Sequence, residues 1–164
     1  MKNKGKLILF SGKMGAGKTT LSKSISSELV AIHISEDEWL SSHYPEDIKS
    51  FEDYLLYSQR IKPFVKSHIQ QLLKIGLTVV LDFPGNTSKQ REWLLSLSNE
   101  VNCEHELIFL NVSDEVCLSQ IAKRGKEQPE RTKFDTPEVF HEVTKYFESP
   151  AEDEGLNIAV FIHN

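Results

Sequence analysis

The sequence predicts an α/β protein with three layers, in which helices cover both faces of a parallel sheet of about five strands. Short apolar runs rich in β-branched residues alternate along the chain with segments of helical periodicity. One run, Val79-Val80-Leu81, is continuously apolar, which is typical of a strand buried on both faces. No repeat or linker interrupts the pattern, so we expect a single domain over residues 1–164.

The first strand is predicted at Lys6–Phe10, where an apolar run leads into a glycine-rich loop. A helix is expected to follow from about Lys18 to Leu29, and the β-branched run Val30–Ile34 predicts the second strand. The pattern between Ser35 and Arg60 is mixed, with a turn at Tyr44-Pro45.

Residues 61–75 predict the next helix, since their apolar positions recur every three or four residues. Gly76 stands where that helix would end, and Pro63 is expected in its first turn or at a kink. The remaining elements are predicted from apolar runs and capping residues: a strand at Leu77–Leu81, a helix at Ser88–Leu97, a strand at Glu106–Val112, a helix from Ser113 to about Arg124, a helix from Thr136-Pro137 and a strand at Asn157–Ile162.

Residues 12–19, with the sequence GKMGAGKT, match the phosphate-binding loop GxxxxGK[ST] between a strand and a helix. In such a loop the glycines let successive backbone N–H groups point at phosphate, the lysine reaches the outer phosphates and the hydroxyl can bind Mg²⁺. The pattern therefore predicts nucleotide binding by Gly12, Lys13, Met14, Gly15, Ala16, Gly17, Lys18, Thr19 and Thr20. The sequence has no Asn-Lys-x-Asp element of the kind that GTPases use for guanine, which favours ATP.

The acidic triplet Glu36-Asp37-Glu38 follows the second predicted strand, where ligands of open α/β sheets bind. We expect Asp37 to face the γ-phosphate and to accept or align the proton of an attacking hydroxyl. For Glu36 and Glu38 the sequence allows two roles, a contact with the substrate or a negative charge that complements the dipole at the start of a helix. The triplet also hints at a neutral or cationic acceptor.

Asp82 ends the third predicted strand and is expected to hold Mg²⁺ together with Thr19. No glutamate follows Asp82, which favours transfer to a bound substrate over ATP hydrolysis. Asn86 is open between a substrate contact and a turn residue.

The polar segment at about residues 125–136 lacks periodicity and is predicted to form a lid. Arg124 and Arg131 are expected to close over the phosphates, because a guanidinium matches phosphate oxygens in charge and shape. Arg60 and Arg91 are weaker candidates for substrate binding, with a surface role as the alternative.

A net charge of −5 argues against non-specific binding to nucleic acid or to an anionic membrane. No apolar segment approaches the length of a membrane span and no secretory signal opens the chain, so we expect a cytoplasmic protein. Cys103 and Cys117 have no metal-ligand spacing and are expected to be reduced thiols.

The chain resembles the small P-loop kinases that include polynucleotide kinases, chloramphenicol phosphotransferase and zeta-toxin-like kinases. The resemblance lies in residues 12–20, 35–38 and 79–86 and in the arginine-bearing lid, and it implies a nucleoside-monophosphate-kinase-like P-loop domain. It also implies Asp37 as general base, Lys18 and Thr19 on phosphate and Mg²⁺, and Arg124 in the lid. Leu40 stands where polynucleotide kinases carry an arginine, which argues against a nucleic-acid acceptor.

Residues 79–87, with Asp153-Glu154-Gly155, resemble a bacterial subgroup usually called ATP-binding proteins or ATPases. Taken together, the sequence predicts a kinase that uses ATP and Mg²⁺ to phosphorylate a hydroxyl of a small molecule. A nucleic-acid 5′-hydroxyl or nucleotide acceptor is one alternative, and a non-catalytic ATP- or GTP-dependent module is another. No pattern indicates an oligomeric state.

Overall fold

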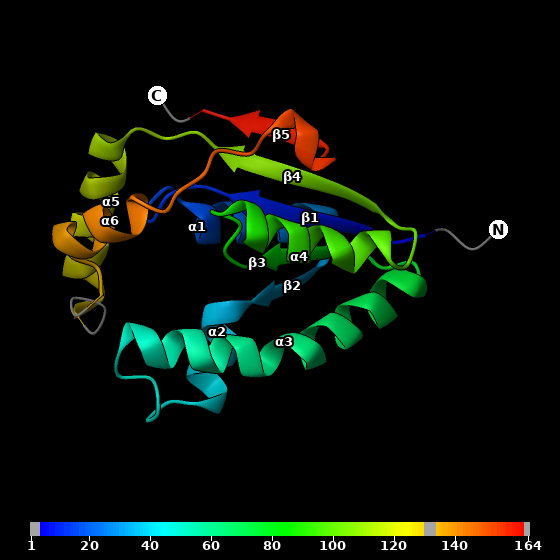
Figure 1. Ribbon diagram of the computed structural model, residues 1–164, viewed down its shortest axis with the longest axis horizontal. Helices are drawn as coiled ribbons and strands as arrows, with labels where there is room; N and C mark the ends of the chain where they lie inside the picture. Colours follow the sequence, from blue (N-terminus) through cyan, green and yellow to red (C-terminus); the bar gives the residue numbers. More distant parts are fainter. Residues whose placement is uncertain (1–3, 130–133, 163–164) are drawn as a thin grey trace.

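A five-stranded parallel sheet with the order β2-β3-β1-β4-β5 forms the centre of the computed structural model, which describes residues 4–129 and 134–162 (Figure 1). The strands are β1 (Lys6–Ser11), β2 (Ile32–Ser35), β3 (Val79–Asp82), β4 (Glu104–Leu110) and β5 (Ile158–Phe161). The helices are α1 (Lys18–Leu29), α2 (Glu36–His43), α3 (Phe51–Lys74), α4 (Ser88–Asn99), α5 (Asp114–Glu127) and α6 (Pro137–Thr144). The predicted three-layer fold is confirmed.

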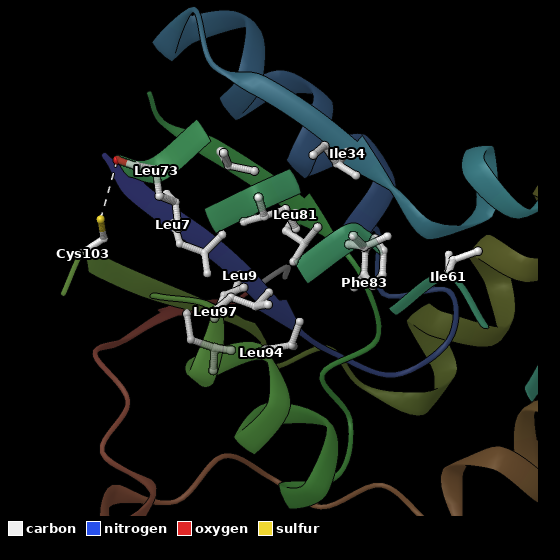
Figure 2. Packing of buried hydrophobic residues seen from close by; sticks show 14 of the residues in the cluster. Leu7, Leu9, Ile34, Ile61, Leu73, Leu81, Phe83, Leu94, Leu97 and Cys103 are labelled. Carbon is white, nitrogen blue, oxygen red and sulfur yellow. Dashed lines mark hydrogen bonds between the residues drawn. The ribbon is translucent and has the colours of Figure 1, made fainter. Parts of the chain in front are cut away.

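The central strand β1 divides the apolar core into two parts, because its side chains alternate between the faces of the sheet. Leu7 and Leu9 pack on the face covered by α3 and α4, and Figure 2 shows Leu94 and Leu97 of α4 beside Leu9. Ile8 and Phe10 pack on the opposite face with residues of α1, α5 and α6. β1 is therefore buried on both sides, as its apolar sequence predicts.

The crevice at the carboxyl ends of the strands lies between the neighbouring strands β1 and β3, because the chain continues from these two strands to opposite faces of the sheet. The helix after β1, α1, packs on one face, while the helix after β3, α4, packs on the other. This is a topological switch point, the place where open α/β sheets bind ligands. Figure 1 shows α5 and α6 beyond the same edge of the sheet.

The second strand begins at Ile32, so the sequence-based prediction of a start at Val30 is wrong. Val30 ends α1 in the left-handed conformation with φ 51°, and its side chain is 94% exposed. The N–H of the next residue, Ala31, bonds back to the carbonyl of Ser26. A β-branched residue rarely adopts positive φ and is common in strands, so valine predicts a strand at a position that is in fact a helix cap.

Helix α3 starts at Phe51, well before the predicted start at Ile61. Ser50 and Asp53 form a capping box. The Ser50 hydroxyl accepts the backbone N–H of Asp53, and the Asp53 carboxylate accepts the backbone N–H of Ser50. Pro63 therefore lies in the interior of the helix rather than in its first turn. The helix also buries Ile61, Val65 and residues further along against the sheet, which outweighs the hydrogen bond lost at proline.

Two smaller expectations concern cysteines and membrane spans. Cys103 and Cys117 are both free thiols in buried positions, in agreement with the sequence. Within residues 4–129 and 134–162, none of the helices combines the length and the apolar character needed to traverse a bilayer.

Arg91 of α4 fastens the segment before β5 to the rest of the domain. Its guanidinium is 1% exposed and forms a two-pronged ion pair with Glu154, with N–O distances of 2.6 and 2.7 Å. It also donates to the carbonyl oxygens of Gly85 and Glu148 at 3.1 and 2.7 Å. Arg91, which the sequence left open as a substrate contact, therefore has its donors committed to holding the chain together.

We expect Arg91→Met to lower the free energy of unfolding by about 3–5 kcal/mol, because it leaves the Glu154 carboxylate without its partner in a largely buried position. Denaturant titration followed by circular dichroism measures the change. The matched control is Lys66→Met, which removes an exposed pair with Glu100 and should cost less than about 1 kcal/mol. Equal losses in the two variants would contradict a structural role for Arg91.

Candidate functional site

The phosphate-binding loop joins β1 to α1 at the crevice, and glycine is required at Gly15. Gly15 has φ 78°, and a Cβ there would lie 2.6 Å from the carbonyl oxygen of Cys117 and 2.7 Å from the Ile121 side chain. The loop thus lies directly against α5, leaving no room for a side chain at this point. Gly17, with φ 96°, caps α1, so the free N–H groups at the start of the helix face the crevice.

Lys18 folds over the loop that precedes it. Its ammonium donates to the backbone carbonyl oxygens of Gly12 and Lys13. Burial lowers the pKa of Lys18, while the negative charges of Asp82 and Asp37 oppose this shift. The ammonium therefore lies in a desolvated position within the field of both carboxylates, where a phosphate group would be a strong counterion.

Thr19 and Asp82 are brought together across the crevice. The Thr19 hydroxyl donates to Asp82 Oδ2 at 2.8 Å, although 63 residues separate them in sequence. A hydroxyl and a carboxylate at this spacing are oxygen ligands of the kind that Mg²⁺ accepts, with phosphate and water completing its octahedron. The described residues contain no cluster of three or more His, Cys, Asp or Glu able to hold a metal ion, so such a site would depend on the nucleotide.

Asp37 reaches the same crevice from β2. Ser35, the last residue of β2, lies opposite Asp82 in the parallel register and caps α2 by accepting the N–H of Glu38 at 3.3 Å. Asp37 is exposed in the first turn of α2, close enough for its charge to raise the pKa of Lys18. Glu38 points elsewhere, to Lys23 at 3.2 Å on the exposed surface.

Glu36 turns inward and is only 2% exposed. Its carboxylate accepts hydrogen bonds from the hydroxyls of Tyr54 and Ser58, the latter at 2.8 Å. Burial raises the pKa of Glu36 despite these bonds. Tyr54, Ser58 and Lys62 recur every four residues on one face of α3, a signal that becomes readable once the capping box at Ser50 places the start of that helix.

Asn86 supports the phosphate-binding loop. Its side-chain oxygen accepts the N–H of Gly12 at 3.0 Å, and its own N–H donates to Gln90 at 2.8 Å. The Gly12 N–H, predicted from sequence to face a phosphate, is therefore bonded within the protein. Of the two roles that the sequence left open for Asn86, the structure shows the structural one.

Lys13, Met14 and Arg124 connect the loop with α5 and its surroundings. Lys13 pairs with Asp114 at 2.6 Å, while Met14 packs against the core on the α5 side. Arg124 forms a two-pronged pair with Asp135, with N–O distances of 2.7 and 2.8 Å, and its charge lowers the pKa of Lys18. The guanidinium therefore lies within the electrostatic range of the loop.

The other predicted site residues lie further from these contacts. Ala16 is buried in the core, and Thr20 is exposed on the first turn of α1. Arg60 is exposed and stacks over the Tyr57 ring, 5.0 Å from its centroid. Arg131 lies outside the described residues, and so does part of the predicted lid at residues 125–136. The first residues of that predicted lid belong to the last turn of α5.

Comparison with known families gives one match over most of the chain. The model of an AAA domain family matches residues 7–150. An adenylate kinase of Prochlorococcus marinus (strain MIT 9301) is 31% identical over 145 residues, which cover 79% of this chain and 77% of the relative. The match thus includes the phosphate-binding loop, the acidic triplet and the strand that ends in Asp82.

Solved structures share the fold at low sequence identity. A candidate kinase from Chloroflexus aurantiacus superposes with a TM-score of 0.78 at 17% identity, covering 99% of this chain and 87% of that one. An APS kinase from Mycobacterium tuberculosis, in complex with AMPPNP and APS, has a TM-score of 0.69 at 14% identity, covering 98% and 89%. The narrower resemblance to polynucleotide kinases, chloramphenicol phosphotransferase and zeta-toxin-like kinases stays a prediction.

The raised pKa of Glu36 predicts a pH-dependent cost of folding. When an acid has a higher pKa in the folded than in the unfolded state, the folded protein loses stability as the pH rises above the ordinary pKa of 4.5. Once the acid is fully ionised, the loss is about 1.4 kcal/mol for each pH unit by which the two pKa values differ. We therefore expect Glu36→Gln to gain stability relative to the wild type as the pH increases from 4.5, measured as the difference in unfolding free energy. Glu38→Gln, at an exposed position, should show no such trend, and parallel profiles for Glu36→Gln and wild type would contradict the prediction.

Proposed function

We propose that this chain, which belongs to the AAA domain family of P-loop kinases, transfers the γ-phosphoryl group of ATP to a hydroxyl of a small molecule. One observation carries the proposal: the Lys18 ammonium at the crevice lies in the field of two carboxylates, Asp82 at the end of β3 and Asp37 in the helix turn that follows the neighbouring strand β2. In this proposal Asp82 binds the metal ion and Asp37 accepts the proton of the acceptor or aligns its hydroxyl. A nucleotide-binding module without an acceptor would need only the first.

The loop and the start of α1 supply the binding of ATP in this proposal. The N–H groups at the start of α1 and the Lys18 ammonium would hold the β- and γ-phosphates, which releases Lys18 from the carbonyls of Gly12 and Lys13. Thr19 and Asp82 would hold Mg²⁺, which when bound neutralises charge between the β- and γ-phosphates. The single domain over residues 1–164 would then contain all the groups that bind the phosphates.

Asp37 is the proposed general base or aligning group for the acceptor. The acceptor hydroxyl gives its proton to the carboxylate of Asp37 as its oxygen forms the new bond to the γ-phosphorus. The bond from phosphorus to the bridging oxygen breaks, and ADP leaves with that electron pair. The position of Asp37 on the first turn of α2, beside the end of β3, supports this role.

Arg124 is proposed to offset the charge that develops during transfer. Its guanidinium already influences the pKa of Lys18, and Asp135 orients it through both carboxylate oxygens. A guanidinium held in this way suits the equatorial oxygens of the transferred group. Arg131 and the lid at residues 125–136 are proposed to complete the cover over the phosphates.

A nucleoside monophosphate is the second candidate acceptor, and the similarity to an adenylate kinase favours it. In that case the attacking atom is a phosphate oxygen, which needs no general base, and Asp37 would be dispensable for proton transfer. Comparing AMP with neutral alcohols as acceptors therefore separates the two candidates.

We expect Asp37→Asn to lower kcat for phosphorylation of an alcohol by about 10²–10⁴-fold while the affinity for Mg²⁺–ATP changes little, because the base is lost and the loop is intact. Product formation measured by mass spectrometry, together with calorimetry for nucleotide binding, tests both parts. Glu38→Gln, one residue along the same helix turn, is the matched control. Full turnover by Asp37→Asn would contradict the assignment of the base.

Asp82→Asn should weaken nucleotide binding about 10–100-fold in Mg²⁺ and much less in EDTA, because Asp82 is proposed to act through the metal. Calorimetric titration with AMPPNP under both conditions measures the difference. The control is Glu106→Gln, an acid of β4 that pairs with Lys6, the first residue of β1. An equal loss with and without Mg²⁺ would count against a metal role.

A further inference from the structure

A small cavity is lined by residues that directly adjoin, in sequence, the two carboxylates of the proposed site. Its volume is about 80 Å³, and it is enclosed by the first residue of α2, the first half of α3, the end of β3 and the start of α4. Glu36, which lines it, directly precedes Asp37, and Phe83, on another wall, directly follows Asp82. A ligand bound here would have to extend out of the cavity to reach Asp37, because Asp37 is exposed while Glu36 is buried in the same helix turn.

The cavity contains a buried carboxylate that has no ionic partner in the part of the chain that the structure describes. The ion pairs found there include none to Glu36, whose two oxygens accept only the hydroxyls of Tyr54 and Ser58. Each oxygen keeps a lone pair for a further donor. Lys62, the cationic residue among those that line the cavity, has its ammonium over the Trp93 ring, 5.1 Å from the centroid, and although it forms no ion pair with Glu36 its charge lowers the pKa of that carboxyl.

The other walls of the cavity are partly apolar and partly polar, formed by Leu55, Phe83, Pro84 and Trp93 on one hand and by Gln59, Lys62 and Gln90 on the other. Phe83 is 2% exposed, and its ring stacks with that of Trp93 at a centroid distance of 6.1 Å. These rings can cover the carbon skeleton of a small molecule, while Glu36 supplies the negative charge of the lining and Lys62 the positive one. A buried carboxylate in the lining of such a pocket favours a ligand by the position and sign of its charge.

Resting on the proposed function, we propose that this cavity holds the acceptor and that the acceptor is a small alcohol carrying a protonated amine, with the ammonium on Glu36 and a hydroxyl toward Asp37. An ammonium donates up to three hydrogen bonds and would give the buried carboxylate the ionic partner that it lacks. Burial raises the pKa of Glu36, and a bound cation would lower it again. An anionic group placed at Glu36 would be repelled by its carboxylate.

Three matched probes test the charge selection: 2-amino-1,3-propanediol, glycerol and glycerate, which all carry a primary hydroxyl and differ in charge. Each is titrated into the ¹⁵N-labelled full chain in Mg²⁺–AMPPNP, and the indole N–H signal of Trp93 reports binding. Trp39, the second tryptophan, is not among the residues lining the cavity and provides an internal reference, and Trp39→Phe assigns the two signals.

We expect the amine to bind at least about ten-fold more tightly than glycerol, and glycerate to bind most weakly, because charge-assisted hydrogen bonds are the strong ones. Glu36→Gln keeps the size of the side chain and should remove this preference, whereas the exposed control Glu38→Gln should keep it. Equal affinities in the wild type, tighter binding of glycerate, or a preference that survives in Glu36→Gln would each overturn the proposal.

The same three compounds are then incubated with Mg²⁺–ATP, and phosphorylated product is followed by mass spectrometry. Phosphorylation of the amine with the highest kcat/KM supports both the acceptor class and the proposed function. Product from glycerol or glycerate in preference to the amine overturns the acceptor class and leaves the kinase activity standing. Selective binding of the amine without product from any of the three overturns the proposed function, while the ammonium site on Glu36 stands.

Discussion

The carboxyl edge of the sheet is organised around one desolvated positive charge, the ammonium of Lys18. Its position follows from the loop, which turns against α5 at Gly15 and directs the side chain back over the carbonyls of Gly12 and Lys13. Burial disfavours this charge, and the carboxylates of Asp82 and Asp37 compensate for part of that cost. Since a polyphosphate would supply the missing negative charge, the same constraint explains why the crevice is suited to a nucleotide.

The acidic triplet after β2 shows how one helix start can separate three adjacent carboxylates. The side chains of residues 36, 37 and 38 point away from α2 in different directions, as those of successive helix residues do. Glu36 is buried against α3, Asp37 is exposed toward Lys18, and Glu38 pairs with Lys23 at the surface. Three like charges in sequence thus become a buried hydrogen-bond acceptor, a proposed catalytic group and a surface ion pair.

The residues behind the loop are as important to the site as those within it. Asn86 fixes the start of the loop through the Gly12 N–H, and the nearby Arg91 ties the segment that contains Glu148 and Glu154 to α4. Arg91 and Arg124 both form two-pronged pairs with a carboxylate, but Arg91 is 1% exposed while Arg124 keeps 30% of its side chain exposed near the loop. Burial therefore distinguishes Arg91, which is enclosed by the segments that it joins, from Arg124, whose proposed role requires partial exposure.

The sequence by itself determined the parallel sheet, the phosphate-binding loop and the position of Asp82 at the end of a strand, because these features depend on local periodicity and on glycine, lysine and threonine at fixed spacing. Only the tertiary structure decided which way Glu36 faces and that Asn86 and Arg91 form hydrogen bonds within the protein. These outcomes depend on contacts between segments up to 74 residues apart, such as Gly12 with Asn86. A charged side chain carries no local signal for its partner, since the same arginine pairs with phosphate or with glutamate according to what the fold places beside it.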